Sequence, residues 1–172
     1  EESIPLTPVK LEMYRGDSFQ VVVDKPEYAL AIAIALRAKL KAETPDEQKL
    51  WDARLAVGVG DISFESDNIV TSDGEAFRLS GHSFDHIGKK RLSISTPWPD
   101  FNTNIELVTR FADDLITSWK AKQARVVYQS LLFPKLQKDL AEELDMTRQN
   151  FNYHWSSARG QLILDYIEYF KS

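Results

Sequence analysis

Strand-like alternation of apolar and polar residues is confined to the first part of the sequence, and this restriction limits the fold more than any other feature. The alternation occurs over 9–15, 18–24, 53–62 and 92–96, whereas only helical spacing remains from Asn102 onward. A period of two favours strands, and a period near 3.6 favours helices. We therefore predict an α+β fold, with a mixed, largely antiparallel sheet covered by helices and an all-helical C-terminal part.

The first two strands are expected to form a hairpin that reverses at Gly16 and Asp17, because both residues tolerate the left-handed backbone of a tight turn. A helix is expected over 26–42, with Pro26 in its first turn and a mostly apolar surface that should lie deep against a sheet. The strand within 53–62 has one face made only of Ala and Gly. Such a face lets a helix or a ligand approach closely.

Two later helices have expected packing faces that the structure can test. The helix within 73–88 should pack through Phe77, Gly81, Phe84 and Gly88, with Ser80 beside them. The helix after Asn102 should pack through Val108, Phe111, Ala112, Leu115 and Trp119. A long last helix is expected from Thr147 toward Phe170. We place the domain boundary near residue 117, which gives an α+β domain over 1–117 and a helical domain over 118–172.

The two expected domains differ in charge. Residues 1–117 hold 13 Lys and Arg against 20 Asp and Glu, whereas residues 118–172 hold 8 against 6. Only the C-terminal part is electrostatically suited to meet the phosphates of a nucleic acid. The absence of Cys fits a reducing cytoplasm, and no apolar run approaches the roughly 20 residues that a membrane span needs.

The segment "LQKDLAEELDMTRQNFNYHW", residues 136–155, carries the most specific pattern of the chain. Ala141 on a short helix, a corner at Asp145, Thr147 as N-cap and Phe151 four residues later have the spacing of two closely crossing helices. Across about 119–160 the chain resembles the helix-turn-helix domains of bacterial transcription factors. Asp145 occupies the turn position that usually holds Gly, and Asp adopts the left-handed conformation at some cost.

The resemblance implies a binding site for double-stranded DNA. In such a motif, side chains from the start of the second helix enter the major groove, where Arg suits guanine and Asn or Gln suits adenine. The matching residues are Thr147, Arg148, Gln149, Asn150, Asn152 and Tyr153. An ordinary helical hairpin that packs or dimerises is the alternative. Because the net positive charge is small, we expect a monomer to bind DNA weakly and a homodimer to compensate.

A second resemblance covers residues 11–96. The hairpin with "RGDSFQ", the strand "ARLAVGVGDI" and the helix opening "SDGEAFRLSG" are similar to the second half of a class III nucleotide cyclase domain or its GGDEF relatives, whose sheet is ferredoxin-like. Followed by a helix-turn-helix, they resemble the SatD family of bacterial proteins more closely. The first strand of a cyclase domain would precede the sequence given. The resemblance implies a ligand site at Gly16, Asp17 and Ser18, with Asp17 holding a divalent metal such as Mg²⁺.

Several positions depart from the cyclase pattern. Two-metal phosphoryl chemistry needs two carboxylates, and no early residue of this sequence supplies the second. Arg78 and His82 occupy the positions of the Asn and Arg that act on the transition state in cyclases, and Met13 occupies that of the base-reading Lys. We therefore predict no catalytic residues, and we leave open whether Asp17 serves the turn or a ligand.

Together these patterns predict a cytoplasmic DNA-binding transcriptional regulator. Its N-terminal, cyclase-like domain would sense a ligand, such as a nucleotide effector, or mediate dimerisation, and we expect no membrane contact. The alternative is a metal-dependent enzyme that binds or cyclises nucleotides and carries an accessory helical tail. Salt dependence of DNA binding and metal dependence of turnover distinguish the two functions.

Overall fold

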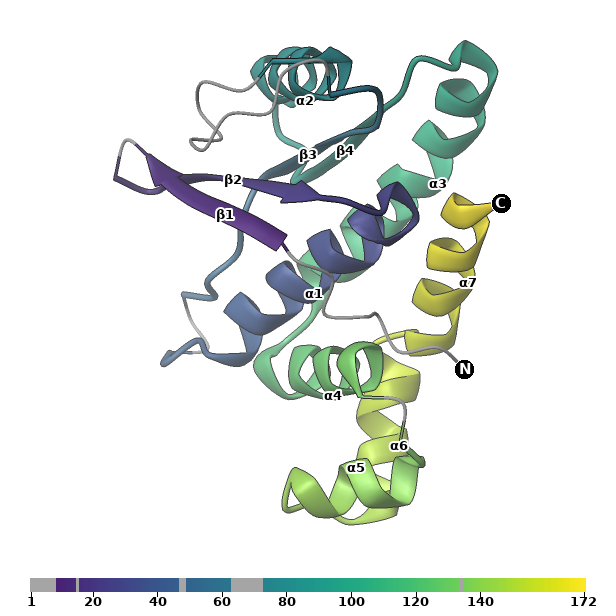
Figure 1. The fold of residues 1–172 in the computed structure, drawn as a ribbon. Coiled ribbons are helices and arrows are strands. Elements are labelled where there is room, and N and C mark those ends of the chain that lie inside the picture. The colour runs from purple at the N-terminus through teal and green to yellow at the C-terminus, as the bar shows by residue number, and fades with distance from the viewer. Residues whose placement is uncertain (1–8, 15, 47–48, 63–72, 134) are drawn as a thin grey trace. The chain divides into compact units, whose positions relative to one another are not determined.

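The computed structural model describes residues 9–14, 16–46, 49–62, 73–133 and 135–172, and Figure 1 shows their elements. The strands are β1 (Val9–Tyr14), β2 (Ser18–Val23), β3 (Leu55–Gly58) and β4 (Leu92–Ser95). A 3₁₀ turn, Pro26–Tyr28, leads into the first helix. The helices are α1 (Ala29–Ala42), α2 (Glu75–Asp85), α3 (Pro99–Ser118), α4 (Ala121–Leu132), α5 (Gln137–Glu143), α6 (Arg148–Ser157) and α7 (Gly160–Lys171). The fold is mixed α and β, as expected.

The described residues form two compact units. One contains residues 30–53 together with 111–172, and the other contains the hairpin and residues 54–110. Residues 30–53, which we expected in the N-terminal domain, thus share a compact unit with the C-terminal helices. The continuous domains 1–117 and 118–172 stay a prediction.

The strands form two separate sheets within the described part of the chain. β1 pairs with β2 in antiparallel fashion, with Leu11 opposite Val21 and Met13 opposite Phe19, so the expected hairpin is confirmed. β3 pairs with β4 in parallel, with Leu55 opposite Leu92. We expected one mixed sheet. Alternation predicts which residues form strands, but strand pairing depends on contacts between distant segments that a local period does not encode.

Helix α2 packs against β3 and β4 (Figure 1), and the close approach expected over the Gly face of β3 is confirmed. A Cβ atom placed on Gly58 would lie 2.2 Å from the carbonyl oxygen of Ala76 and 2.7 Å from the backbone nitrogen of Ser80. The face of α2 that meets the sheet therefore contains Ala76 and Ser80. The expectation that Gly81 faces the sheet is wrong, because nothing lies within 4 Å of a Cβ atom built there.

Phe84, another residue of the expected α2 face, is also exposed in part. Its side chain is 43% accessible, and the guanidinium of Arg54 lies 5.6 Å from its ring centroid. A helix of this length has few apolar residues, so its apolar pattern does not define one packing face clearly. The small residues of α2 pack against the small residues of β3, because only small residues let the two backbones approach closely.

The exposed and buried faces of α3 also differ from the expectation. One buried stripe has residues spaced four, three and four apart, at Ile105, Thr109, Ala112 and Ile116, and Asp113 is buried next to Ala112, whereas Phe111 is 66% exposed. The expected stripe shared only Ala112 and, just past the helix end, Trp119 with the buried set. Two apolar stripes lie side by side on this helix, and the tertiary structure buries the one that holds Ile105 and Ile116.

The long last helix expected from Thr147 toward Phe170 is two helices, α6 and α7. Arg159 breaks the helical path with a φ of 56°. Next to it, a Cβ atom on Gly160 would lie 2.3 Å from the Trp155 ring, so the chain turns where only Gly fits. The indole Nε1–H of buried Trp119 donates to the carbonyl oxygen of Ala158 at 2.9 Å and satisfies the end of α6.

Arg37 and Lys41 are buried in α1, although Arg and Lys are among the residues found least often inside proteins. The Arg37 guanidinium binds Asp52 through two hydrogen bonds of 2.9 Å, and it binds Asp113 at 2.6 Å. Lys41 Nζ donates to the carbonyl oxygen of Thr117 at 2.9 Å. Each cation is therefore compensated, as burial of charge requires.

No helix of the described residues has the length and apolar character needed to cross a membrane.

Candidate nucleic-acid interface

The corner between α5 and α6 is built by backbone hydrogen bonds at the end of α5. The N–H of Met146 donates to the carbonyl oxygen of Ala141 at 3.0 Å, and the N–H of Asp145 donates to that of Glu142 at 3.1 Å. These two bonds and the left-handed Asp145, with a φ of 52°, make a Schellman turn. The left-handed conformation expected at Asp145 is confirmed.

Helix α6 begins with the N-cap that the sequence indicated. Thr147 has an extended backbone, and its hydroxyl accepts a hydrogen bond from the backbone N–H of Asn150 at 3.1 Å. One of the unpaired N–H groups of the first turn is thereby satisfied. The direction of α6 is consequently determined from its first residue, Arg148.

A small apolar core holds α4, α5 and α6 together. It contains Val126 of α4, Leu140 and Ala141 of α5, and Phe151 of α6, all at most 2% exposed. Leu144, Met146 and Trp155 pack against this core. Ala141 carries the smallest side chain of the set and lets α5 and α6 approach closely. The inward position of Phe151 determines which side of α6 faces the solvent.

The polar residues at the start of α6 lie on that solvent side. Thr147, Arg148, Gln149 and Asn150 are exposed, Asn152 is half-buried, and Tyr153 is 67% exposed. They lie close together because they occupy the first turns of the same helix. The amide groups are consequently accessible to a partner, with Asn152 the least so.

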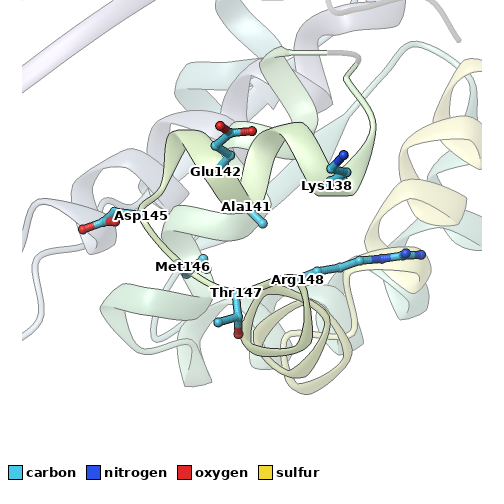
Figure 2. A pocket seen from close by; sticks show the side chains of 7 residues that line it. All are labelled: Lys138, Ala141, Glu142, Asp145, Met146, Thr147 and Arg148. Atoms are coloured by element: carbon cyan, nitrogen blue, oxygen red, sulfur yellow. The ribbon is translucent and has the colours of Figure 1, made fainter.

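A shallow depression of about 450 Å³ lies between α5 and the start of α6. Figure 2 shows its lining side chains, with Lys138 and Arg148 toward one end and Asp145 toward the other. Ala141, Met146 and Thr147 lie between these two ends. The depression therefore has a basic end, to which α5 and α6 both contribute, and an acidic end at Asp145.

The charges around this surface nearly balance. Lys135 is paired with Glu143, and both side chains are partly exposed. Burial lowers the pKa of His154, and the nearby Lys122 ammonium lowers it further, so the neutral form of this side chain is favoured. The basic character of the surface therefore depends on a few Lys and Arg residues, with Arg148 at the start of α6.

The second predicted site lies on the β1–β2 hairpin, in the other compact unit. Gly16 has a φ of 79°, Asp17 is exposed, and Ser18 is half-buried as the first residue of β2. Asp145 and Arg159 are the non-Gly residues of positive φ in the described part of the chain, so Asp17 is not left-handed. Gly16 supplies the unusual backbone conformation, and the turn does not require Asp17 for it.

A metal at Asp17 remains a prediction. Among the described residues, no group of three His, Asp or Glu side chains is placed to hold a metal ion. Asp73 is paired with Arg78 at 2.9 Å. The rings of His82 and His86 are in contact, with centroids 4.3 Å apart and planes inclined by 40°. Within the described ranges, Asp17 thus belongs to no group of three potential metal ligands.

Sequence reasoning missed the buried charges of α1. The helix over 26–42 was expected to be apolar on most sides until Arg37, and no role was assigned to its cations. A signal was present, because Leu30, Ile34, Arg37 and Lys41 follow one another at spacings of four, three and four. Both cations therefore continue the apolar stripe and must share its burial.

No protein-family model, no curated protein and no solved structure matches this chain.

Proposed function

We propose that the protein is a DNA-binding transcriptional regulator in which α5 and α6 act as a helix-turn-helix and α6 is the recognition helix. One observation carries the proposal. Arg148, Gln149 and Asn150 are exposed at the start of a helix whose direction is determined by a capped corner and a packed core. Base edges in the major groove are read by side chains in this position.

Each exposed side chain has a role that follows from its chemistry. Arg148 would donate two hydrogen bonds to a guanine, and Gln149 or Asn150 would pair with the donor and acceptor of an adenine. Asn152 and Tyr153 lie on the next part of the helix and would extend the contact. Thr147 binds the backbone of α6, so its role is to hold the first turn in place.

The charges of this surface support weak binding by one protomer. Lys135, Lys138, Arg148 and Arg159 are matched in number by acidic residues of the same segment, which are Asp139, Glu142, Glu143 and Asp145. Contacts to phosphates supply most of the affinity of a DNA-binding protein, and this surface has few cations for them. We therefore propose a homodimer that binds two half-sites, about 34 Å apart if they lie one DNA turn apart.

The N-terminal part would regulate this activity in the cytoplasm. Its hairpin, strand and helix order, followed by the two C-terminal helices, resembles the SatD family, and Gly16, Asp17 and Ser18 form the ligand site that this resemblance implies. The accessibility of Asp17, together with the finding that the turn does not need it, supports a role toward a ligand such as a nucleotide. Self-association through this part is the other role that we propose for it.

The test is selection of sequences from a random double-stranded DNA library by the full chain, followed by fluorescence anisotropy with the selected duplex. Affinity should fall steeply as salt is raised, because binding releases counterions from the DNA. Arg148→Ala should reduce the preference for the selected duplex over a scrambled one by about tenfold or more, the value of one paired contact to a base.

Two control variants separate base reading from general charge and general polarity. Lys171→Ala removes an exposed cation on α7 that is paired with Glu168, and Gln161→Ala removes an exposed amide on α7. Neither should change the preference. The proposal fails if the chain binds no duplex even at low salt, or if Arg148→Ala and Lys171→Ala behave alike.

The exposed carboxylate of Asp17 favours a second candidate function, that of a metal-dependent enzyme. A carboxylate that is exposed beside a left-handed Gly, and that the turn does not need, is suited to bind a divalent metal with a nucleotide. A metal-dependent enzyme would then carry α4–α7 as an accessory. Turnover of a nucleoside triphosphate that requires Mg²⁺ and is lost in Asp17→Ala would support it, whereas salt-dependent DNA binding that is unchanged in Asp17→Ala supports the regulator.

A further inference from the structure

A small cavity of about 170 Å³ lies beside the outer edge of β4, between this strand and residues of α2 and α3. All of its lining residues belong to the compact unit that contains the hairpin. None of its lining residues belongs to α6 or to the hairpin tip. Its polar groups are not used by either site described above.

The backbone of β4 offers a donor and an acceptor to this cavity. The N–H of Leu55 donates to the carbonyl oxygen of Arg91, and the N–H of Val59 donates to that of Ser95, so alternate residues of β4 bond to β3. In a strand, the residues between them point their N–H and C=O groups to the opposite edge. Ile94 is such a residue, and in the described part of the chain its backbone has no partner on that edge.

Thr96 is the next residue whose backbone groups point away from β3, and its hydrogen bonds show which kind of group pairs with this edge. The backbone N–H of Thr96 donates to Asn102 Oδ1 at 2.9 Å, and Asn102 Nδ2 donates to the carbonyl oxygen of Thr96 at 2.7 Å. A single planar amide thus satisfies both backbone groups of Thr96. A ligand with an adjacent donor and acceptor could do the same at Ile94, two residues earlier along the edge.

The cavity is suited to a small molecule and not to an added peptide strand. The Thr96–Asn102 pair closes one end, and the pair between Lys90 Nζ and Glu106 Oε1 at 3.4 Å closes the other. An extended peptide would have to displace both. A small ligand that fits between the two pairs would leave both of them intact.

The rim of the cavity carries positive charge. Arg110 lines it, and within the described residues its side chain makes no hydrogen bond or ion pair. Lys90 is partly exposed, and its contact with Glu106 is long, so this pair contributes little to stability. Arg110 is therefore available to an anionic group that enters beside the strand edge.

We propose that this cavity binds a small anion that carries a planar amide or lactam edge, with the edge paired to the backbone of Ile94 and the anionic group beside Arg110. Heterocyclic carboxylates and mononucleotides both have this chemistry. The proposal is independent of DNA binding by α6, and it places a ligand at a site distinct from Gly16, Asp17 and Ser18.

The experiment is titration of the ¹⁵N-labelled full chain with uracil-6-carboxylate and uridine 5′-monophosphate, followed by NMR and calorimetry. Binding should move the backbone amide signals of Ile94 and Arg110 at millimolar ligand. Uridine has the lactam edge but no anionic group, and inorganic phosphate has the anionic charge but no lactam edge. Both should therefore bind more weakly than the two anionic heterocycles. The tighter of the two anionic ligands identifies a carboxylate or a phosphate as the preferred group.

Arg110→Gln should weaken binding of the tighter ligand by about tenfold, the loss expected for a charge-assisted hydrogen bond. Lys89→Gln removes a neighbouring exposed cation that does not line the cavity, and it should bind as the unmodified chain does. Circular dichroism should show that both variants are folded. The proposal is overturned if neither anion binds at millimolar concentration, if Arg110→Gln binds equally well, or if the shifted signals belong to 16–18 instead.

Discussion

The backbone N–H of Met146 donates to the carbonyl oxygen of Ala141 at 3.0 Å, and this hydrogen bond closes the corner from which α6 starts. It requires a left-handed residue between the two, and that residue is Asp145 with a φ of 52°. A non-Gly residue is strained in this conformation, whereas Gly is not. The orientation of the exposed residues of α6 thus depends on a strained Asp.

Asp145→Gly should therefore raise the free energy of unfolding of the helical part by about 1 kcal/mol. Asp145→Ala should lower it, because Ala keeps the strain and loses the polar side chain that tolerates it. Chemical denaturation followed by circular dichroism measures both. Equal stability of the Gly and Ala variants would contradict the role assigned to this corner.

Thr147→Ala removes the hydroxyl that accepts from the N–H of Asn150, and it should lower the free energy of unfolding by about 1 kcal/mol. Thr147→Ser keeps a hydroxyl and should have a smaller effect. If α6 reads DNA, the Ala variant should also lose sequence preference because its first turn frays, and the Ser variant should retain it. Denaturation and anisotropy together test both statements.

Gly58→Ala and Gly81→Ala form a matched pair in the other compact unit. A Cβ atom on Gly58 would meet the backbone of α2 at 2.2 Å, whereas nothing lies within 4 Å of a Cβ atom on Gly81. Gly58→Ala should therefore destabilise by more than 1 kcal/mol, in the range of other overpacked sites. Gly81→Ala should stabilise by about 0.5–1 kcal/mol, because Gly is unfavourable inside a helix. Thermal denaturation of the two variants gives the comparison.

Arg37→Ala should destabilise by about 3–5 kcal/mol, since it leaves the carboxylates of Asp52 and Asp113 buried without their main partner. Lys39→Ala, two residues along the same helix, removes an exposed pair with Glu43 and should change stability far less, because solvent screens exposed ion pairs. Similar losses in the two variants would mean that the Arg37 network contributes no more than a surface pair.

The pH dependence of stability should report on Asp52. Burial alone would raise the pKa of this carboxyl, but hydrogen bonds and charge from Arg37, with Lys41 nearby, hold it below its ordinary value. Because the folded-state pKa is the lower one, the Asp52 carboxylate makes its full contribution to the free energy of unfolding above about pH 4, where the unfolded carboxyl is ionised as well. This contribution is lost as the pH falls through the folded-state pKa. We therefore expect the denaturation midpoint to change less with pH over this acid range in Asp52→Asn than in the unmodified chain.

Local patterns in the sequence determined most of the elements. Alternation predicted the hairpin and both short strands, the Ala and Gly face of β3 predicted the close approach of a helix, and Thr147 predicted the start of α6. These features depend on residues close in sequence, through period, turn conformation or a cap. The exposed residues of α6 were predictable for the same reason, because Phe151 defines the buried side.

The tertiary structure decided what a local period leaves open. It placed the strands in two sheets, chose Ile105 and Ile116 over Val108 and Phe111 as the buried stripe of α3, and divided the last helix at Arg159. It also buried Arg37 by bringing Asp113 to it from 76 residues away. Each outcome depends on which distant segments meet, since burial and charge compensation are properties of contacts and not of neighbouring residues in the chain.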